Sequence, residues 1–130
     1  MGKYVIKETA KGGFTFRLKA GNGEIIGTSE HYKQLDGCKN GIASVAKNAP
    51  VAEIEDQTKE GFEKAKNPKF EIYKDKAGQF RFRLKAKNGQ IIAASEGYVK
   101  KDSCKNGIDS VRRNAPDAPV LEPAPEEKAE

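Results

Sequence analysis

The sequence contains two copies of one stretch of about 48 residues. Residues 3–50 align with residues 69–116 at a constant offset of 66 positions, without a gap. About 27 of the aligned positions are identical. Two copies are too few for a solenoid, which needs at least three stacked units. The duplication therefore predicts one pseudo-two-fold unit, in which the copies pack like the subunits of a dimer fused into one chain.

The first part of each copy has the alternation of apolar and polar residues that indicates β-strands. In the first copy the three segments are residues 4–8, 14–20 and 24–28. Phenylalanine and leucine alternate with arginine and lysine in the second segment, as expected for a half-buried strand. Asn22-Gly23 then favours a tight hairpin, because both residues of such a turn take a positive φ. Each copy is therefore expected to begin with a three-stranded antiparallel meander.

The spacing of apolar residues then changes from two to three or four, which predicts a helix. In the first copy the apolar face comprises Leu35, Cys38, Ile42, Val45 and Ala49. The second copy repeats this face from Cys104 to Ala115, with Lys101 in place of the leucine. Pro50 and Pro116 are expected to end the two helices.

A glycine lies in the middle of each predicted helix, at Gly41 and Gly107. Each is expected to cost about 0.5–1 kcal/mol relative to alanine. Two explanations are open. The preferred one is close packing of the helix on the sheet or on its twin. The other is a turn at Asn40-Gly41 that interrupts the helix.

Each copy ends in a short apolar segment, residues 51–55 and 117–122, which is expected to form a fourth strand. The chain thus divides into a first repeat, a charged linker, a second repeat and an acidic tail: residues 1–55, 56–68, 69–122 and 123–130. The tail is rich in proline, alanine and glutamate and is expected to be disordered. The predicted class is α+β, with two tandem β-β-β-α-β repeats that form an antiparallel sheet with one helix per repeat.

The repeated motifs are Asn22-Gly23-x-Ile25-Ile26-x-x-Ser29-Glu30-x-Tyr32, Cys38-x-x-Gly41-Ile42-x-Ser44-Val45-x-x-Asn48-Ala49, and their counterparts 66 positions later. Together they resemble the YegP-like family of small uncharacterised proteins with two tandem copies of the repeat. The resemblance covers nearly all of residues 3–122. It implies that the two units share one sheet by exchanging their final strands. It supplies no activity, because the family has none established.

The residue types used in catalysis and metal binding are sparse. His31 is the one histidine, and its counterpart in the second copy is Gly97. Cys38 and Cys104 lie on the apolar helix faces, where a thiol is by default a small buried hydrophobe. No Cys-x-x-Cys pair accompanies them, so a zinc site lacks its usual four ligands. We therefore expect no metal, no cofactor and no enzymatic activity.

A polar cluster recurs where the third strand meets the helix. It comprises Ser29, Glu30, Tyr32, Ser95, Glu96 and Tyr98. The favoured interpretation is structural, with side chains that bond to the local backbone. The alternative is a pair of symmetric polar pockets in which Glu30 and Glu96 act as hydrogen-bond or acid/base groups. An enzyme that uses these two glutamates is the weakest of three functional hypotheses.

A row of cations lies on the strand face opposite the phenylalanines. The candidate binding surface comprises Arg17, Lys19, Arg81, Arg83, Lys85 and Lys87. With a formal net charge of +5, such a face suits phosphates if it is open. Single-strand binders usually add exposed aromatic residues, and Tyr73 is the main candidate here. An acidic tail lying against this face would weaken the binding of polyanions.

These features lead to two main functional hypotheses. The first is a small non-catalytic binding or interaction module with an unknown macromolecular partner. The second is a nucleic-acid-binding accessory protein that uses the basic strand face. No apolar run approaches the roughly 20 residues that span a bilayer, and no secretory signal is recognisable. A monomeric, soluble, cytoplasmic protein without a membrane partner is therefore expected.

Overall fold

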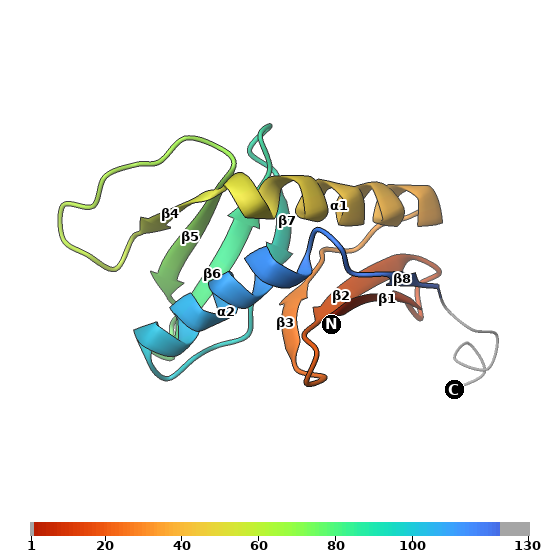
Figure 1. Cartoon of the computed structure of the whole chain (residues 1–130), viewed down its shortest axis with the longest axis horizontal. Coiled ribbons are helices and arrows are strands. Elements are labelled where there is room, and N and C mark those ends of the chain that lie inside the picture. The colour runs from red at the N-terminus through yellow and green to blue at the C-terminus, as the bar shows by residue number, and fades with distance from the viewer. Residues whose placement is uncertain (1, 123–130) are drawn as a thin grey trace.

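The computed structural model describes residues 2–122 (Figure 1). Its first repeat contains β1 (Lys3–Glu8), β2 (Phe14–Lys19), β3 (Ile25–Thr28), α1 (Leu35–Asn48), a 3-10 turn η1 (Ala49–Val51) and β4 (Glu53–Asp56). The second repeat contains β5 (Lys69–Lys74), β6 (Phe80–Lys85), β7 (Ile91–Ala94), α2 (Lys101–Asn114) and β8 (Val120–Leu121). The predicted α+β class and the β-β-β-α-β order of each repeat are confirmed.

All eight strands form one sheet, in the order β4-β5-β6-β7-β3-β2-β1-β8. The two meanders meet at its centre, where Thr28 of β3 pairs with Ala94 of β7. The last strand of each repeat joins the other repeat: β4 pairs with β5, and β8 pairs with β1. The expected exchange of final strands is therefore present.

The exchanged strands make the sheet mixed, where an antiparallel sheet was expected. β4 and β8 run parallel to their neighbours, and the other pairs are antiparallel. The reason lies in the helices, since each helix carries the chain back across the sheet before its last strand begins. Pro119 directly precedes β8, which is two residues long and lies at a sheet edge, where proline is tolerated.

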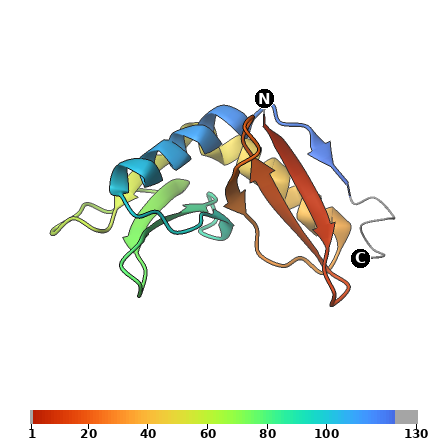
Figure 2. The same cartoon turned by 90° about the horizontal axis from the view of Figure 1, so that it is seen from below.

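Both helices cover the same face of the sheet. Helix α1 contacts β2 of its own repeat and β7 of the other, while α2 contacts β6 and β3. Each helix thus spans the central junction and ties the two meanders together. Figure 2 shows the sheet as an arch with both helices on its convex side, so that neither α1 nor α2 lies on the concave side.

The core lies between the sheet and the helices, and most of its residues are identical in the two repeats. Phe16, Leu18, Phe82 and Leu84 are at most 2% exposed, as are the helix residues Val45 and Val111. The alternation and helical spacing predicted these positions correctly. Among residues 2–122, no helix is both long and apolar enough to cross a membrane.

Helix α1 continues without interruption through Gly41, and α2 through Gly107. A Cβ at Gly41 would overlap the Tyr32 hydroxyl and lie 3.2 Å from Cε2 of Phe16. At Gly107 a Cβ would lie 2.5 Å from the Tyr98 hydroxyl oxygen. Close packing therefore explains both glycines, and the alternative of a helix-breaking turn is wrong.

The predicted linker is anchored to the sheet at its start. β4 ends at Asp56, one residue inside the range expected for the linker. The backbone N–H of Gln57 donates to the carbonyl oxygen of Ile72 at 2.9 Å. The N–H of Ala65 donates to a carboxylate oxygen of Glu55 at 2.8 Å. The acidic tail, 123–130, lies outside the described residues.

Candidate functional site

The serines of the polar cluster bond to the backbone. Ser29 Oγ accepts a hydrogen bond from the N–H of Phe16 at 2.8 Å and donates to the carbonyl oxygen of Glu30 at 2.8 Å. Ser95 does the same with Phe82 at 2.9 Å and Glu96 at 2.8 Å. These contacts fasten the end of the third strand to the second strand. They support a structural role for the serines.

The tyrosines of the cluster complete the core beneath the helices. The Tyr32 ring stacks on Phe16 with ring centroids 6.3 Å apart, and Tyr98 stacks on Phe82 at 6.4 Å. Burial raises the pKa of Tyr32, and nearby Cys38 and Glu30 add to this shift. Burial likewise raises the pKa of Tyr98, so both phenols stay neutral at physiological pH, as packing groups do.

The glutamates of the cluster do not meet. Glu30 lines a cavity of about 440 Å³ together with Tyr32 and Lys85. Glu96 lines another cavity, of about 340 Å³, with Glu24 and Tyr98. Each cavity combines the polar cluster of one repeat with the Asn-Gly hairpin of the other. Both glutamates are exposed, so neither cavity offers the buried carboxyl group that an acid/base catalyst usually needs.

The cysteines and the histidine do not form a site. Cys38 and Cys104 are free thiols with 0% exposure. Burial raises the pKa of each to about 11, and Asp56 contributes to the shift at Cys104. Nε2 of His31 lies 3.0 Å from the Thr9 hydroxyl oxygen, near the β1–β2 turn. Within residues 2–122, no group of three or more acidic, histidine or cysteine side chains has a metal-binding arrangement.

We therefore expect both thiols to resist modification in the folded protein. At pH 8 a pKa of about 11 leaves about a thousandth of each thiol ionised. In a reaction with Ellman's reagent, we expect modification at least about 100-fold slower than in guanidinium chloride, where the chain is unfolded. Rapid modification of one thiol in native buffer would contradict this burial.

The concave face of the sheet carries one continuous line of cross-strand neighbours. In spatial order across the sheet the line is Leu121, Val5, Arg17, Thr28, Ala94, Arg83, Glu71 and Glu55. The two halves are related by the repeat. Arg17 corresponds to Arg83, whereas Val5 corresponds to Glu71 and Leu121 to Glu55. The arginines are shared by both halves, but only the second half carries carboxylates.

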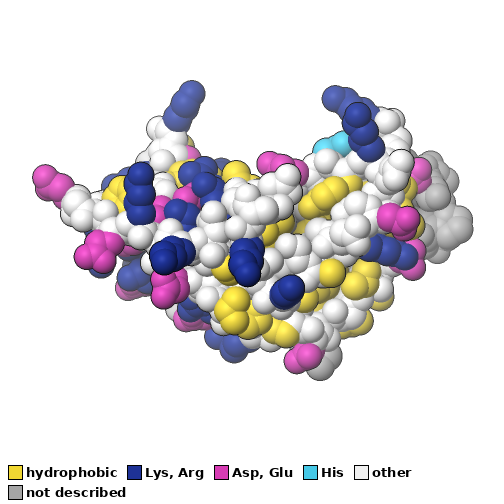
Figure 3. Space-filling view, turned by 90° about the horizontal axis from the view of Figure 1, so that it is seen from above, with side chains coloured by type: hydrophobic (Ala, Val, Ile, Leu, Met, Phe, Trp, Pro, Cys, Tyr) yellow, Lys and Arg dark blue, Asp and Glu magenta, His cyan; other side chains and the backbone are white. Residues whose placement is uncertain are grey.

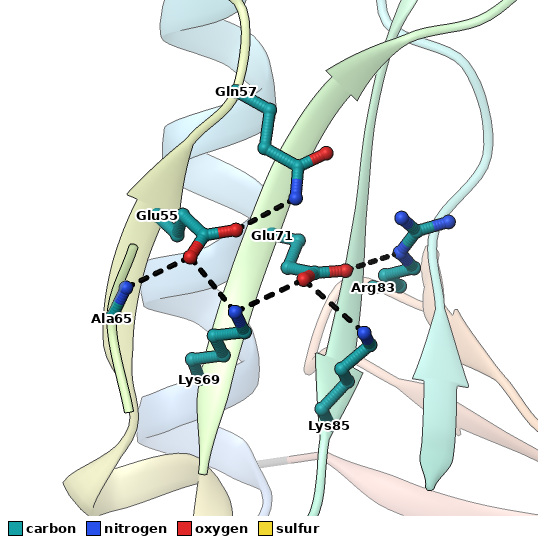
Figure 4. Close-up of polar contacts among 7 residues, drawn as sticks. All are labelled: Glu55, Gln57, Ala65, Lys69, Glu71, Arg83 and Lys85. Atoms are coloured by element: carbon teal, nitrogen blue, oxygen red, sulfur yellow. Dashed lines mark hydrogen bonds and ion pairs between the residues drawn. The ribbon is translucent and has the colours of Figure 1, made fainter. Parts of the chain in front are cut away.

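In the second half these carboxylates form ion pairs with the cations (Figure 4). Glu71 forms ion pairs with three of them. The distances are 2.6 Å to Arg83 Nε, 3.2 Å to Lys69 Nζ and 3.3 Å to Lys85 Nζ. Glu55 pairs with Lys69 at 2.8 Å and accepts a hydrogen bond from Gln57 at 2.7 Å. We call Lys69, Arg83 and Lys85 the second-repeat cations.

The network holds both carboxylates in their charged form. Burial alone would raise the pKa of Glu55, but hydrogen bonds from Lys69, Gln57 and the Ala65 N–H lower it to about 2. Burial acts on Glu71 in the same direction, and hydrogen bonds from Arg83 and Lys69 outweigh it, so that the pKa of Glu71 is also lowered. Both groups are therefore ionised at neutral pH although they are buried.

The other predicted cations of the second repeat lie apart from this network. Arg81 Nε is 2.7 Å from Asp75 Oδ2, in the turn before its own strand. Lys87 is exposed beside the β6–β7 hairpin and lines a cavity of about 370 Å³ with residues of α1. Tyr73, the aromatic candidate for base stacking, has the Arg83 guanidinium 4.6 Å from its ring centroid.

The first half has the corresponding cations without the carboxylates. We call Lys3, Arg17 and Lys19 the first-repeat cations. Lys3 on β1 is the cross-strand neighbour of Lys19 on β2, and Arg17 lies two residues from Lys19 on the same face. Among the described residues, none of the three side chains has an ion pair or a hydrogen bond. Lys3 is exposed, and Arg17 and Lys19 are half-buried.

Lys3, Glu55 and Glu71 belong to this surface but are absent from the residues selected on the sequence. One signal was available, because Val5 and Glu71 differ between two otherwise similar repeats. The cross-strand register that brings Glu71 beside Arg83 could not be read from the sequence.

Figure 3 shows the concave side in profile as a hollow between two projections that end in Lys or Arg side chains.

Known proteins share both the sequence and the fold. The family described as "Domain of unknown function (DUF1508)" matches residues 10–56 and 75–122. The "UPF0339 protein in ptx operon 5'region" of Stutzerimonas stutzeri is 40% identical over 121 residues, which cover 93% of this chain and 96% of that protein. The solution structure of the E. coli protein of unknown function yegP has a TM-score of 0.77 and 35% identity, and the match covers 93% of this chain and 91% of that one.

A shorter relative contains one copy of the repeat. A UPF0339 protein of Treponema denticola is 65% identical over 54 residues, which are 93% of that protein and 42% of this chain. These relatives are themselves uncharacterised, so they assign no activity. Because the match includes both repeats and extends over most of the chain, this protein belongs to the DUF1508 family, in its two-repeat form.

Proposed function

We propose that this protein is a non-catalytic binding module that holds a partner against the concave face of its sheet. The observation that carries the proposal is that α1 and α2 both cover the convex side, so that neither helix covers the concave strands of the first repeat. Within residues 2–122, Arg17 and Lys19 have no ion pair, and both lie on that face, where a partner would meet them. A half-buried cation without a partner carries a desolvation cost that an anionic partner would relieve.

Nucleic acid is the partner class that this surface favours. The first-repeat cations lie on adjacent strands, as contacts to successive phosphates require. The aromatic contribution is weak, because the Arg83 guanidinium already lies over the ring of Tyr73. We therefore expect contacts to the phosphate backbone, with little preference for sequence.

An NMR titration tests this proposal. Mixed-sequence single-stranded RNA and DNA are added to the full chain, and to a chain that ends at Glu122, at 50 and 200 mM salt. We expect amide shifts confined to the concave strands around Arg17 and Lys19. The affinity should fall at least about tenfold between the two salt concentrations. Removal of the acidic tail should strengthen binding.

Two variants make the result specific. Arg17→Gln removes a cation from the concave face, and Arg113→Gln removes an exposed cation from α2. We expect only the first to weaken binding, by about threefold to tenfold. Equal effects of the two variants, shifts on the helices, or no shift with either oligonucleotide would overturn the nucleic-acid assignment.

A further inference from the structure

We propose that the first-repeat cations form a binding site for a phosphate group that carries two negative charges. The site lies on the concave face above Val5, between β1 and β2. The inference rests on the proposed function of that face and specifies the chemistry of one contact. It also implies that the repeats differ in role, with an internal anion in the second and an external one in the first.

The second repeat provides the template for this site. Its three cations converge on one carboxylate, that of Glu71, at distances of 2.6 to 3.3 Å. The Glu71 side chain is 4% exposed and lies among these cations, beside Glu55 on the neighbouring strand β4. This geometry demonstrates that a lysine, an arginine and a lysine at these strand positions can together hold an oxyanion.

The first repeat has the same cations on the same framework. Lys3 faces Lys19 in the β1–β2 register, as Lys69 faces Lys85 in the β5–β6 register. Arg17 faces Val5 where Arg83 faces Glu71. A valine side chain ends before the carboxylate carbon of a glutamate would begin. The space that the Glu71 carboxylate fills in the second repeat is therefore left to a ligand in the first.

The surroundings favour an anion with two charges. The second-repeat cations are balanced by two carboxylates, Glu71 and Glu55. Both counterparts in the first repeat are apolar, namely Val5 and Leu121. On the other side, Arg17 faces Thr28. No acidic residue lies in this line from Leu121 to Thr28, and Lys7 adds a further positive charge on β1.

A phosphate group matches these requirements better than a carboxylate does. A phosphomonoester or inorganic phosphate carries about −1.5 to −2 charges near neutral pH and has three strong acceptor oxygens. Lysine and arginine donate charge-assisted hydrogen bonds to such oxygens. The group has two possible sources, free phosphate and the terminal phosphate of an oligonucleotide.

The test is an NMR titration of the full chain with inorganic phosphate at pH 7.5 and constant ionic strength. Sodium acetate serves as the carboxylate comparison. We expect phosphate to shift the amides of Lys3, Arg17 and Lys19, and acetate to produce at least about tenfold weaker binding. An oligonucleotide with a 5′-phosphate is then compared with its 5′-hydroxyl form. Tighter binding of the 5′-phosphate form identifies a terminal phosphate as the source, whereas equal binding of the two forms identifies free phosphate.

Val5→Glu provides the decisive variant, because it places in the first repeat the carboxylate that the second repeat already has. We expect it to weaken phosphate binding at least about tenfold. Val5→Gln has nearly the same size without the charge and should stay within about threefold of the unmodified protein. Val99→Glu makes the same charge change at a position that is 78% exposed and should also have little effect. The amide spectrum of each variant verifies that it is folded.

Failure of the site differs from failure of the proposed function. Absence of phosphate shifts at the first-repeat cations, or equal effects of Val5→Glu and Val5→Gln, would overturn the site. If oligonucleotides still shifted the amide signals of the concave strands, the proposed function would stand without the phosphate site. Phosphate binding that Val5→Glu abolishes, with no response to any oligonucleotide, would support the site and reject nucleic acid. Acetate binding as tight as phosphate would overturn the assignment to phosphate.

Discussion

Replacing Gly41 with alanine is expected to lower the free energy of unfolding by about 1–2 kcal/mol. The added Cβ would overlap the Tyr32 hydroxyl and approach Cζ of the same ring to 2.8 Å. The ring stacks on Phe16, and backbone hydrogen bonds to Phe14 fix the segment that carries it, so relief of the overlap requires the ring to move against Phe16. Overpacking costs about 1–3 kcal/mol, and this exceeds the gain of about 1 kcal/mol in helix propensity.

Another glycine of the same helix provides the matched control. A Cβ at Gly37 would lie 3.5 Å from Cδ1 of Tyr32, which is ordinary contact. Gly37→Ala should therefore be neutral or stabilise the protein by up to about 1 kcal/mol in urea unfolding. In a Tyr32→Leu background the cost of Gly41→Ala should disappear. If it persists there, contact with the ring is not its cause.

Replacing Glu71 with glutamine is expected to lower the free energy of unfolding at pH 7 by about 2 kcal/mol. The substitution leaves the second-repeat cations without their shared counter-charge, while Glu55 still pairs with Lys69. Loss of one partner of a fully buried pair costs about 3–5 kcal/mol. The expected value is lower because the Arg83 and Lys85 side chains are 30% and 27% exposed and reach solvent.

The pH dependence of the free energy of unfolding distinguishes the contribution of the Glu71 charge from the contribution of its packing. Its folded-state pKa is lowered, and that of Glu55 is lowered from 4.5 to about 2. The network therefore stabilises the fold above about pH 4.5, and this contribution is lost as the pH falls toward 2. The difference between Glu71→Gln and the unmodified protein should shrink over the same range.

Glu30→Gln is the control for this experiment, since Glu30 is exposed and has no ion pair among residues 2–122. Its effect on the free energy of unfolding should stay within about 0.5 kcal/mol at every pH. A difference between Glu71→Gln and the unmodified protein that stays constant from pH 7 to pH 2 would show that charge is not the source of the stabilisation.

Much of the fold could be predicted because its signals are local. The alternation around Phe16 and the spacing of Cys38, Ile42 and Val45 each report which side of one element is buried. The predicted close packing at Gly41 is also confirmed. It too had a local signal, because a glycine inside a helical pattern indicates a neighbouring group that leaves no room for a Cβ. The exchange of β4 and β8 was predicted only from the resemblance to a family, because no local pattern in the sequence indicates it.

At the candidate surface, local sequence patterns do not predict which side chains meet across strands. Alternation placed Arg17 and Arg83 on the same face and made them look equivalent. Their surroundings differ, because Arg83 faces Glu71 and Arg17 faces Val5 across the first two strands of each repeat. Glu55 reaches the same network from the first repeat through the exchanged strand. The functional assignment of these residues stays a prediction.

The sequence by itself determined the duplication, the β-β-β-α-β order and the faces that are buried, since turns and periodicities act over a few neighbouring residues. The tertiary structure alone decided which strands are neighbours and hence which charges meet. Strand pairing brings together residues far apart in the chain, and Coulomb interactions depend on the final distance and burial. For this reason one set of three cations forms ion pairs with two carboxylates in the second repeat, while the corresponding set in the first has no ion pair within residues 2–122.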